Sequence, residues 1–241
     1  MTRLATVVDP AGAAQPITTK PELAEVTGKR VVYIATGKFL GVSDKTSEQR
    51  QSIYAIKDPY DSTTNGLIPM TRAGTFPTST ITDFVRQDLT AVDDSTRTTT
   101  IQSGATPVDF TTQNGWFVDL PDGGTTGNPS ERVNVDPILQ LGTLVIGSNV
   151  PIADACVAGG YGWLNFFDYR TGGYILGSTA NAASTKVSGA LVVGINVIQL
   201  PGGSVKTEVT MADNQVTTKD TPTAASSLQG RRVSWRELIV E

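Results

Sequence analysis

The run TTKPELAEVTGKRVVYIATGK at residues 18–38 decides the fold, because the run VNVDPILQLGTLVIGSNV at residues 133–150 repeats its pattern. Each copy contains a strand with x-Pro-x-Leu, a turn at Gly28 or Gly142, and a second strand that is apolar on both faces. In the first copy, Val31, Tyr33 and Ala35 share one face, and Val32, Ile34 and Thr36 share the other. A strand that is apolar on both faces lies between two packed layers. The repeat therefore predicts two similar sheets, each covered on both sides.

The rest of the chain also consists of short strand-like runs. They are rich in Val, Ile, Thr and aromatic residues and end at Gly, Pro, Asn or Asp, and no stretch keeps the i, i+3, i+4, i+7 apolar spacing of a helix. The expected strands are VVYIATG (31–37), SIYAIKD (52–58), FVRQDLTAV (84–92), TRTTTIQ (96–102), GWFVDLP (115–121), RVNVDPILQL (132–141), TLVIGS (143–148), WLNFFDY (163–169), LVVGINVIQL (191–200), VKTEVTM (205–211) and RVSWRELIV (232–240). Many short strands with almost no helix predict an all-β sandwich, barrel or propeller.

The repeat favours the propeller among these folds. Each copy continues with a third strand, at 52–58 or 163–169, and fourth strands are expected at 84–92 and, less clearly, at YIL (174–176). Four antiparallel strands in a covered sheet are typical of a propeller blade. We predict one partial β-propeller-type domain over residues 1–241, with about three four-stranded antiparallel blades at 13–92, 115–176 and 187–241 and inserted strands at 93–114. Propellers close with about four to eight blades, so the ring is expected to be incomplete.

Composition excludes several kinds of site. The 241 residues are 39% apolar, and 19 basic against 23 acidic side chains leave a formal charge of −4 with no long run of one sign. This balance predicts no nucleic-acid binding, and no apolar window is long enough for a membrane span. Histidine is absent and Cys156 is the only cysteine, which excludes a Ser-His-Asp triad, a Cys-His dyad and a zinc site needing several Cys or His ligands. The pairing state of Cys156 stays open.

The loop TGKFLGVSD at residues 36–44 is the first candidate site, because a glycine and a lysine follow an apolar strand. It lacks the first glycine and the Ser or Thr of a Walker motif, and no helix is expected after it to hold a phosphate. We therefore interpret it as a strand end. Gly37 and Gly41 would supply permissive backbone angles, and Phe39 and Leu40 would pack between neighbouring blades.

Tryptophans and aspartates are the other candidates. Trp116, Trp163 and Trp235 are expected to pack between blades, and the alternative is an exposed platform for a carbohydrate or host surface. Asp58, Asp119, Asp136 and Asp168 recur at strand ends, where capping of turns is expected and catalysis by a carboxylate pair is the alternative. The polar tracts STRTTT (95–100) and DNQVTTKDTPTAASS (213–227) are interpreted as solvated segments that could contact another surface. We assign no catalytic, cofactor-binding or metal-binding residue.

Several motifs in series resemble a known family. AAQPITTKPEL (13–23), VVYIATGKFLGVSD (31–44) and QSIYAIKDP (51–59) match, in order and spacing, the C-terminal β-propeller domain of the type IV pilus tip-associated adhesins, the PilC/PilY family. NGWFVDLP (114–121), ERVNVDPIL (131–139), VPIADACVAGGYGWLNFFD (150–168), TGG (171–173) and RRVSWREL (231–238) follow in the family's order. The resemblance covers nearly the whole chain.

The resemblance implies a non-enzymatic structural and adhesion domain that supports type IV pilus assembly and surface attachment. Minor pilins and a host or abiotic surface would be its partners, at the pilus tip, the cell surface or the outer membrane and periplasm. Family members carry a signal peptide and a long N-terminal region, whereas Met1–Gly12 has no signal-peptide pattern and resembles the middle of a blade, so a fragment is expected.

Family members also carry a calcium loop of alternating aspartates, which offers oxygen ligands to the ion. The nearest clusters here, Asp93-Asp94 and Asp119 with Asp122, lack the alternation and are interpreted as surface turns, so no cofactor is expected. Two other functions stay open. One is a propeller enzyme similar to quinoprotein dehydrogenases, which would need a quinone pocket, calcium and a catalytic aspartate. The other is a lectin-like carbohydrate-binding propeller.

Overall fold

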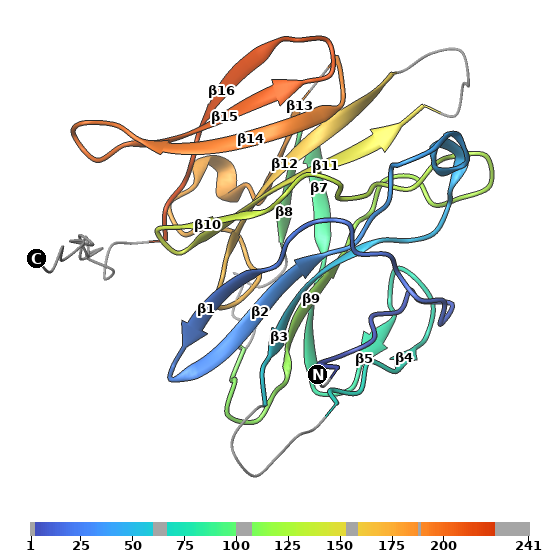
Figure 1. The fold of residues 1–241 in the computed structure, drawn as a ribbon. Coiled ribbons are helices and arrows are strands. Elements are labelled where there is room, and N and C mark those ends of the chain that lie inside the picture. Colours follow the sequence, from blue (N-terminus) through green and yellow to red (C-terminus); the bar gives the residue numbers. More distant parts are fainter. Residues whose placement is uncertain (1–2, 60–66, 100–107, 153–158, 188, 225–241) are drawn as a thin grey trace, which may run out of the picture.

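Three β-sheets are stacked one above another in the computed structural model (Figure 1), which describes residues 3–59, 67–99, 108–152, 159–187 and 189–224. The first sheet has the strand order β1 (Glu22–Val26), β2 (Lys29–Ala35), β3 (Ser52–Lys57), β9 (Gly115–Asp119) and β6 (Phe84–Gln87). The second has the order β10 (Ile138–Gln140), β11 (Thr143–Pro151), β12 (Gly160–Asp168), β13 (Ser184–Val187), β8 (Thr96–Thr99) and β7 (Leu89–Asp93).

The third sheet is smaller and lies at the top of Figure 1. It consists of β14 (Val192–Gln199), β15 (Val205–Met211) and β16 (Val216–Asp220). A two-stranded ribbon of β4 (Arg72–Ala73) and β5 (Thr80–Ile81) and two short 3-10 helices, η1 (Val42–Thr46) and η3 (Thr179–Asn181), complete the elements of the described residues. The all-β prediction is confirmed.

The internal repeat corresponds to two hairpins with the same turn. Thr27 and Gly28 join β1 to β2 with φ values of 49° and 77°, and Leu141 and Gly142 join β10 to β11 with 50° and 78°. Two consecutive residues with positive φ are the signature of a type I′ turn, whose twist matches that of the paired strands. Each hairpin is followed by an antiparallel third strand, β3 or β12, as the repeat predicts.

The expected fourth strands are wrong. In the first sheet the strand beside β3 is β9, and the run 84–92 divides between two sheets, with β6 parallel to β9 and β7 at the edge of the second sheet. In the second sheet the strand beside β12 is β13, whereas residues 174–176 are not a strand. Hydrophobic runs predict strands but not their partners, which here are distant in sequence. The blade ranges 13–92, 115–176 and 187–241 and the inserted strands at 93–114 stay a prediction.

Both large sheets are covered on both faces. One apolar cluster, including Tyr33, Trp116, Leu144 and Phe167, fills the space between the first and second sheets. A second cluster, including Val145, Leu164, Val197 and Val209, fills the space between the second and third sheets. A third lies on the outer face of the first sheet, where the N-terminal segment, β5 and Ile68 cover it.

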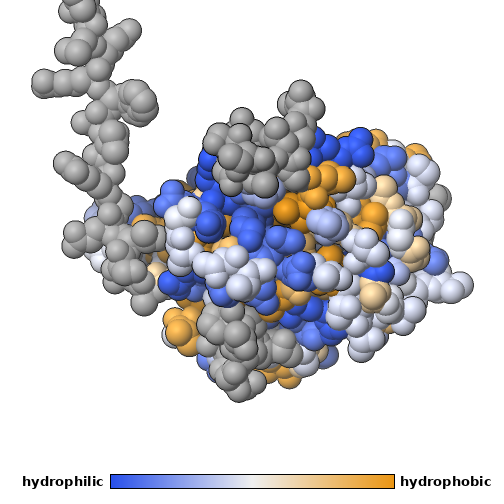
Figure 2. Space-filling view, turned by 90° about the horizontal axis from the view of Figure 1, so that it is seen from below, coloured by the Kyte–Doolittle hydropathy of each residue, from blue (hydrophilic) through white to orange (hydrophobic). Residues whose placement is uncertain are grey.

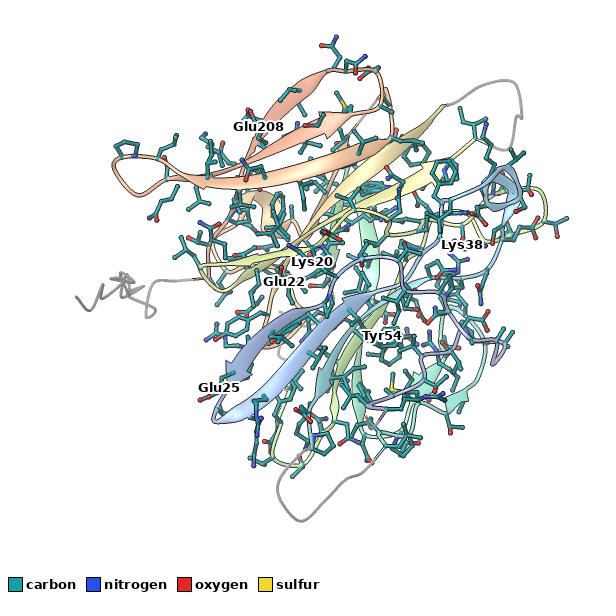
Figure 3. The ribbon with its side chains drawn as sticks, in the orientation of Figure 1. Lys20, Glu22, Glu25, Lys38, Tyr54 and Glu208 are labelled. Atoms are coloured by element: carbon teal, nitrogen blue, oxygen red, sulfur yellow. The ribbon has the colours of Figure 1, made fainter. Side chains whose placement is uncertain are left out.

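Tyr54 of β3 anchors that N-terminal cover. Its ring lies on the outer side of the first sheet, at 6.2 Å from the ring of Phe117 (Figure 3). Its hydroxyl donates a hydrogen bond to Gln15 Oε1 at 2.6 Å and lies 3.2 Å from the carbonyl oxygen of Val8. Burial raises the pKa of this hydroxyl above its usual range, so it stays a donor at physiological pH.

Candidate functional site

A buried polar layer on the inner face of the second sheet is the most unusual group of side chains in the described residues. The register of the sheet aligns, on the face toward the first sheet, the rows Leu144–Phe167, Ile146–Asn165–Ser184–Arg97 and Ser148–Trp163–Lys186. The face therefore changes from apolar in the first row to polar in the second and amphipathic in the third. An arginine, an asparagine and two serines are enclosed between two β-sheets.

Glu131 is the centre of this layer and is fully buried. Its carboxylate accepts hydrogen bonds from Arg97 Nη1 at 3.0 and 3.2 Å and from Ser148 Oγ at 2.6 Å. The chain continues from Asn165 Nδ2 to Ser148 Oγ at 3.0 Å and from Ser184 Oγ to Asn165 Oδ1 at 2.6 Å. Burial is the main cause that raises the pKa of Glu131, and Arg97 opposes it.

Asp122 joins the buried layer to the rim of the sheet. It forms an ion pair with Arg97 Nη2 at 2.6 Å and accepts hydrogen bonds from Tyr161 Oη at 2.9 Å and Trp163 Nε1 at 2.8 Å. The Arg97 guanidinium lies 3.5 Å from the Trp163 ring centroid, and Lys186 Nζ lies 4.0 Å from the centroid of Tyr161. Cation–π contacts of this kind hold the aromatic rings in place.

A second buried ion pair closes the end of the first sheet. Arg72 Nη2 donates to Asp119 Oδ1 at 2.5 Å, and Asp119 also accepts hydrogen bonds from Ser52 Oγ at 2.6 Å and Ser79 Oγ at 3.2 Å. Arg50 lies nearby and donates to the carbonyls of Leu120, Pro121 and Gly123 at 2.7–2.9 Å. Arg50 thereby holds the start of the connection between β9 and β10 against the first sheet.

The chemistry of the two networks is that of structural ion pairs. The carboxylates of Asp119, Asp122 and Glu131 each pair with an arginine and accept a hydrogen bond from a hydroxyl group, as buried ion pairs in a protein interior require. Within the described ranges, no group of three or more Cys, Asp or Glu residues could hold a metal ion. Also within those ranges, no helix is long and apolar enough to cross a bilayer.

Trp116 and Trp163 are buried between sheets, in agreement with the predicted packing. Trp116 is fully buried and Trp163 is 4% exposed, so the alternative of an exposed aromatic platform is wrong for both. Trp116 contacts side chains of both large sheets, and Trp163 packs under Arg97. Trp235 and Cys156 lie outside the described residues, as does the last predicted strand at 232–240.

The predicted aspartates have different roles. Asp168 caps a turn by accepting the Arg170 N–H at 2.9 Å, and Asp93 does so with the Ser95 N–H at 2.7 Å, as expected. Asp136 accepts the Lys20 N–H at 3.0 Å, which ties two distant segments together.

The surface-turn interpretation is wrong for Asp119, which is buried with Arg72, and for Asp122 in the polar layer. Asp58 contributes its own N–H to the carbonyl of Arg30 at 2.8 Å.

Both polar tracts contain a strand, of which the sequence predicts only the one within 96–102. Thr96–Thr99 forms β8 with Arg97 buried, and Val216–Asp220 forms β16 at the edge of the third sheet. The interpretation as solvated segments is wrong for β8, where Arg97 and Thr99 are buried, whereas the residues of β16 are exposed or half-buried as expected. Hydroxyl-rich strands satisfy their backbone groups in a sheet while they expose alternate side chains to water.

The loop at residues 36–44 is a strand end, but only part of its predicted packing is correct. A Cβ at Gly37, which has φ 157°, would lie 2.3 Å from the carbonyl oxygen of Val133, so glycine is required there by close approach. Gly41 has ordinary extended φ, and Leu40 is 77% exposed, so the predictions for these two residues are wrong. Phe39 is half-buried beside Leu191 and Val192.

Arg132 and Asp44 hold this loop in shape. Arg132 is 2% exposed and donates to the carbonyls of Lys38, Asp44, Ser47 and Ser130. Asp44 Oδ2 accepts the N–H groups of Leu40 at 2.8 Å and Gly41 at 3.0 Å, and Oδ1 lies 3.3 Å from Lys38 Nζ (Lys38 is labelled in Figure 3). The Leu40 and Gly41 amides, with Lys38, hold the pKa of Asp44 below its usual value.

We expect Asp44→Ala to lower the free energy of unfolding by about 1 kcal/mol at pH 7, as the loss of a helix cap does. Because the folded pKa is depressed, the stabilisation is present above the unfolded pKa and is lost as pH falls through the folded value, which lies below 3.8. Urea titrations of both proteins between pH 7 and pH 3 would measure the difference. A difference that grows toward pH 3 would contradict the role assigned to the carboxylate.

Sequence reasoning missed the charges that organise this region. Arg97, Arg72 and Arg50 belong to no quoted motif, and Glu131 and Arg132 begin the motif ERVNVDPIL without any sign that they are buried. The only available signal was position, since ERVNVD places two charges directly before an apolar strand. A charge there must either face water or find a buried partner, and the sequence alone does not decide which.

Comparisons with known proteins agree with this architecture. The chain is 29% identical over 185 residues to the type IV pilus biogenesis factor PilY1 of Pseudomonas aeruginosa, over 70% of this chain and 15% of that protein. It is 27% identical over 175 residues to a PilY1 homologue of Xylella fastidiosa, over 70% of this chain and 11% of that protein. A second alignment to that species spans 95% of the chain at 25% identity. The chain thus spans less than a fifth of the length of these relatives.

A solved structure shows the same fold. The C-terminal domain of Pseudomonas aeruginosa PilY1 superimposes with a TM-score of 0.65 at 20% identity, over 91% of this chain and 47% of that one. No family model matches the sequence. The predicted fold class, part of a β-propeller, is confirmed by this match, whereas the number of blades stays a prediction.

Proposed function

Because the chain is homologous to the type IV pilus biogenesis factor PilY1, we propose that it is a non-enzymatic structural and adhesion module of such a factor. In this role it supports pilus assembly and surface attachment. Its partners are pilus components such as minor pilins, together with a host or abiotic surface, and its location is the pilus tip or the cell surface. The homology over 70% of the chain is the observation that carries the proposal.

The physical character of the module supports this role. Two buried arginine–carboxylate networks fasten the β9–β10 connection to both large sheets, so the scaffold resists deformation. A rigid β scaffold with surface loops is suited to hold an interface, although fold alone does not assign a function. Hydrophilic, intermediate and hydrophobic residues are mixed on the face seen from below (Figure 2).

The test is made in the bacterium that encodes the chain. We expect that deletion of residues 13–224 from the complete protein abolishes most surface pili, counted by electron microscopy and in sheared-pilus preparations. An immunoblot shows whether the shortened protein is still made. If it is made in normal amounts and pili are unchanged, the assembly role is wrong.

A point variant tests whether the folded module itself is needed, because it changes the fold of this module without deleting any part of the protein. Trp116→Ala unfolds or loosens the module without removing any other segment, and Thr218→Ala, at an exposed position of β16, is the matched control. The first should reduce pili or attachment and the second should not. Adding pyrroloquinoline quinone and calcium to the purified chain tests the enzyme alternative, because a rise in melting temperature with dye reduction would replace the proposal.

A further inference from the structure

A cavity of about 400 Å³ with both polar and apolar lining lies between the second and third sheets, away from the buried ion pairs. Its lining residues come from β8, β12, β13, β16 and the segment around η3; they are Thr96, Phe166, Gly177, Ser178, Thr179, Ala180, Ala182, Thr185, Lys219, Asp220, Thr221 and Pro222. The third sheet has three strands and the second has six, so β13 and β8 extend beyond the cover. The cavity lies where that cover ends.

The register of the sheets explains why these side chains face one another. Thr96 pairs with Thr185 and Thr185 pairs with Leu164, so these three share the face of the second sheet that packs on the third. In the third sheet, Lys219 pairs with Thr207, on the side that faces the second sheet. Lys219 and the two threonines therefore line opposite walls.

The cavity offers unused polar groups and an apolar surface. Phe166, which is 4% exposed, supplies the apolar surface. Among the described residues, Ser178 Oγ is buried without a hydrogen-bond partner, and the hydroxyls of Thr179 and Thr185 have none either. Three hydroxyls beside an aromatic ring form the kind of surface that binds a sugar, through hydrogen bonds to its hydroxyls and contact with its C–H face.

The charge of the cavity selects among sugars. The carboxylate of Asp220 is mostly exposed and forms an ion pair with Lys206 within the third sheet. The ammonium of Lys219 has no acidic partner among the described residues, which leaves one positive charge at the cavity wall. A partly desolvated cation of this kind favours a carboxylate on the ligand.

We propose that this cavity binds an acidic saccharide of the hexuronate class. Lys219 pairs with the ligand carboxylate, Ser178, Thr179 and Thr185 bind its hydroxyls, and Phe166 contacts the ring. The site deepens the adhesion part of the proposed function by naming a ligand class. Binding itself needs only the folded chain, so it can be measured apart from pilus assembly.

Titration calorimetry and saturation-transfer NMR with the purified chain test the proposal, with D-glucuronate, D-glucose and inorganic phosphate as probes. We expect saturable glucuronate binding in the millimolar range, about tenfold weaker binding of glucose, and no saturable binding of phosphate, since one charge-assisted contact corresponds to about a tenfold change. Lys219→Gln should weaken glucuronate binding about tenfold and leave glucose binding unchanged. Thr185→Val should weaken both sugars.

Lys29→Gln is the matched control, because Lys29 is an exposed lysine of the first sheet. It should bind all three probes as the unchanged chain does, and melting curves confirm that each variant is folded.

Absence of saturable glucuronate binding up to about 50 mM, or equal loss of glucuronate binding in Lys219→Gln and Lys29→Gln, overturns the proposal. Phosphate binding as tight as glucuronate binding also overturns it, because the site would then recognise any anion. Binding and assembly are tested separately. If Lys219→Gln reduces glucuronate binding while deletion of residues 13–224 leaves the number of pili unchanged, the binding site is supported and only the assembly role is wrong.

Discussion

Replacing Trp116 with alanine is expected to lower the free energy of unfolding by about 3–5 kcal/mol, the usual cost of deleting a fully buried large aromatic side chain. The ring centroid lies 6.2 Å from that of Tyr33 and 6.1 Å from that of Phe167, so the side chain packs between residues of both large sheets. Its Nε1 also donates to the carbonyl of Tyr169 at 3.1 Å. Alanine would leave a cavity and remove that hydrogen bond.

The surroundings of Trp116 have little room to collapse into this cavity. The backbone of Gly172 lies against the indole, because a Cβ on Gly172 would come within 2.6 Å of the ring. Equilibrium unfolding in urea measures the loss. Leu40→Ala is the control, since Leu40 is 77% exposed and its removal should change stability by no more than about 0.5 kcal/mol. A loss below about 1 kcal/mol for Trp116→Ala would show that the two sheets do not depend on this contact.

Local pattern predicted the hairpins, because all of their determinants lie within the run itself. Thr27-Gly28 and Leu141-Gly142 follow x-Pro-x-Leu strands, and a glycine with positive φ at the second turn position is what a type I′ turn requires. The apolar character of both faces likewise predicted that the large sheets are covered. These features need no knowledge of distant residues.

Strand partners could not be predicted, because they depend on long-range pairing. The run 84–92 has the pattern of one strand, yet β6 and β7 belong to different sheets. Nothing in its period-2 pattern marks the break at Asp88, since alternation specifies a face and not a neighbour. The polar layer was missed for a related reason. Arg97 lies in a threonine-rich tract that reads as solvated, and only its pairing opposite Ser184 places it inside.

The cavity between the second and third sheets depends on the same long-range pairing. Lys219 and Thr185 are distant in sequence, and they face each other because β16 ends over β13 and β12. The sequence suggested a carbohydrate platform on tryptophan, whereas the structure places unpaired hydroxyls elsewhere, beside a phenylalanine. Sugar recognition therefore could not be located from aromatic residues alone.

Removing the buried carboxylate of Glu131 is the other change expected to have a large effect. Glu131→Ala should lower the free energy of unfolding by about 3–5 kcal/mol, because it removes one of the two carboxylates that pair with the buried Arg97 and leaves Arg97 Nη1 without its acceptor. Arg97 is 2% exposed and cannot turn its guanidinium into water without leaving Trp163. Ser148 Oγ would lose its acceptor as well, which interrupts the chain through Asn165 to Ser184.

A double variant distinguishes a lost ion pair from lost packing. Arg97→Met with Glu131→Met removes both charges and keeps most of the volume, so it should destabilise the chain less than Glu131→Ala alone, as replacement of buried pairs by apolar residues often does. Glu25→Ala, at an exposed position of β1 (Figure 3), is the control for a carboxylate in water and should be nearly neutral. If instead the double variant costs as much as the sum of Arg97→Met and Glu131→Met, the two side chains are not energetically coupled. The polar layer would then fasten the β9–β10 connection through its hydrogen bonds to Asp122 and Ser148 and not through the pair itself.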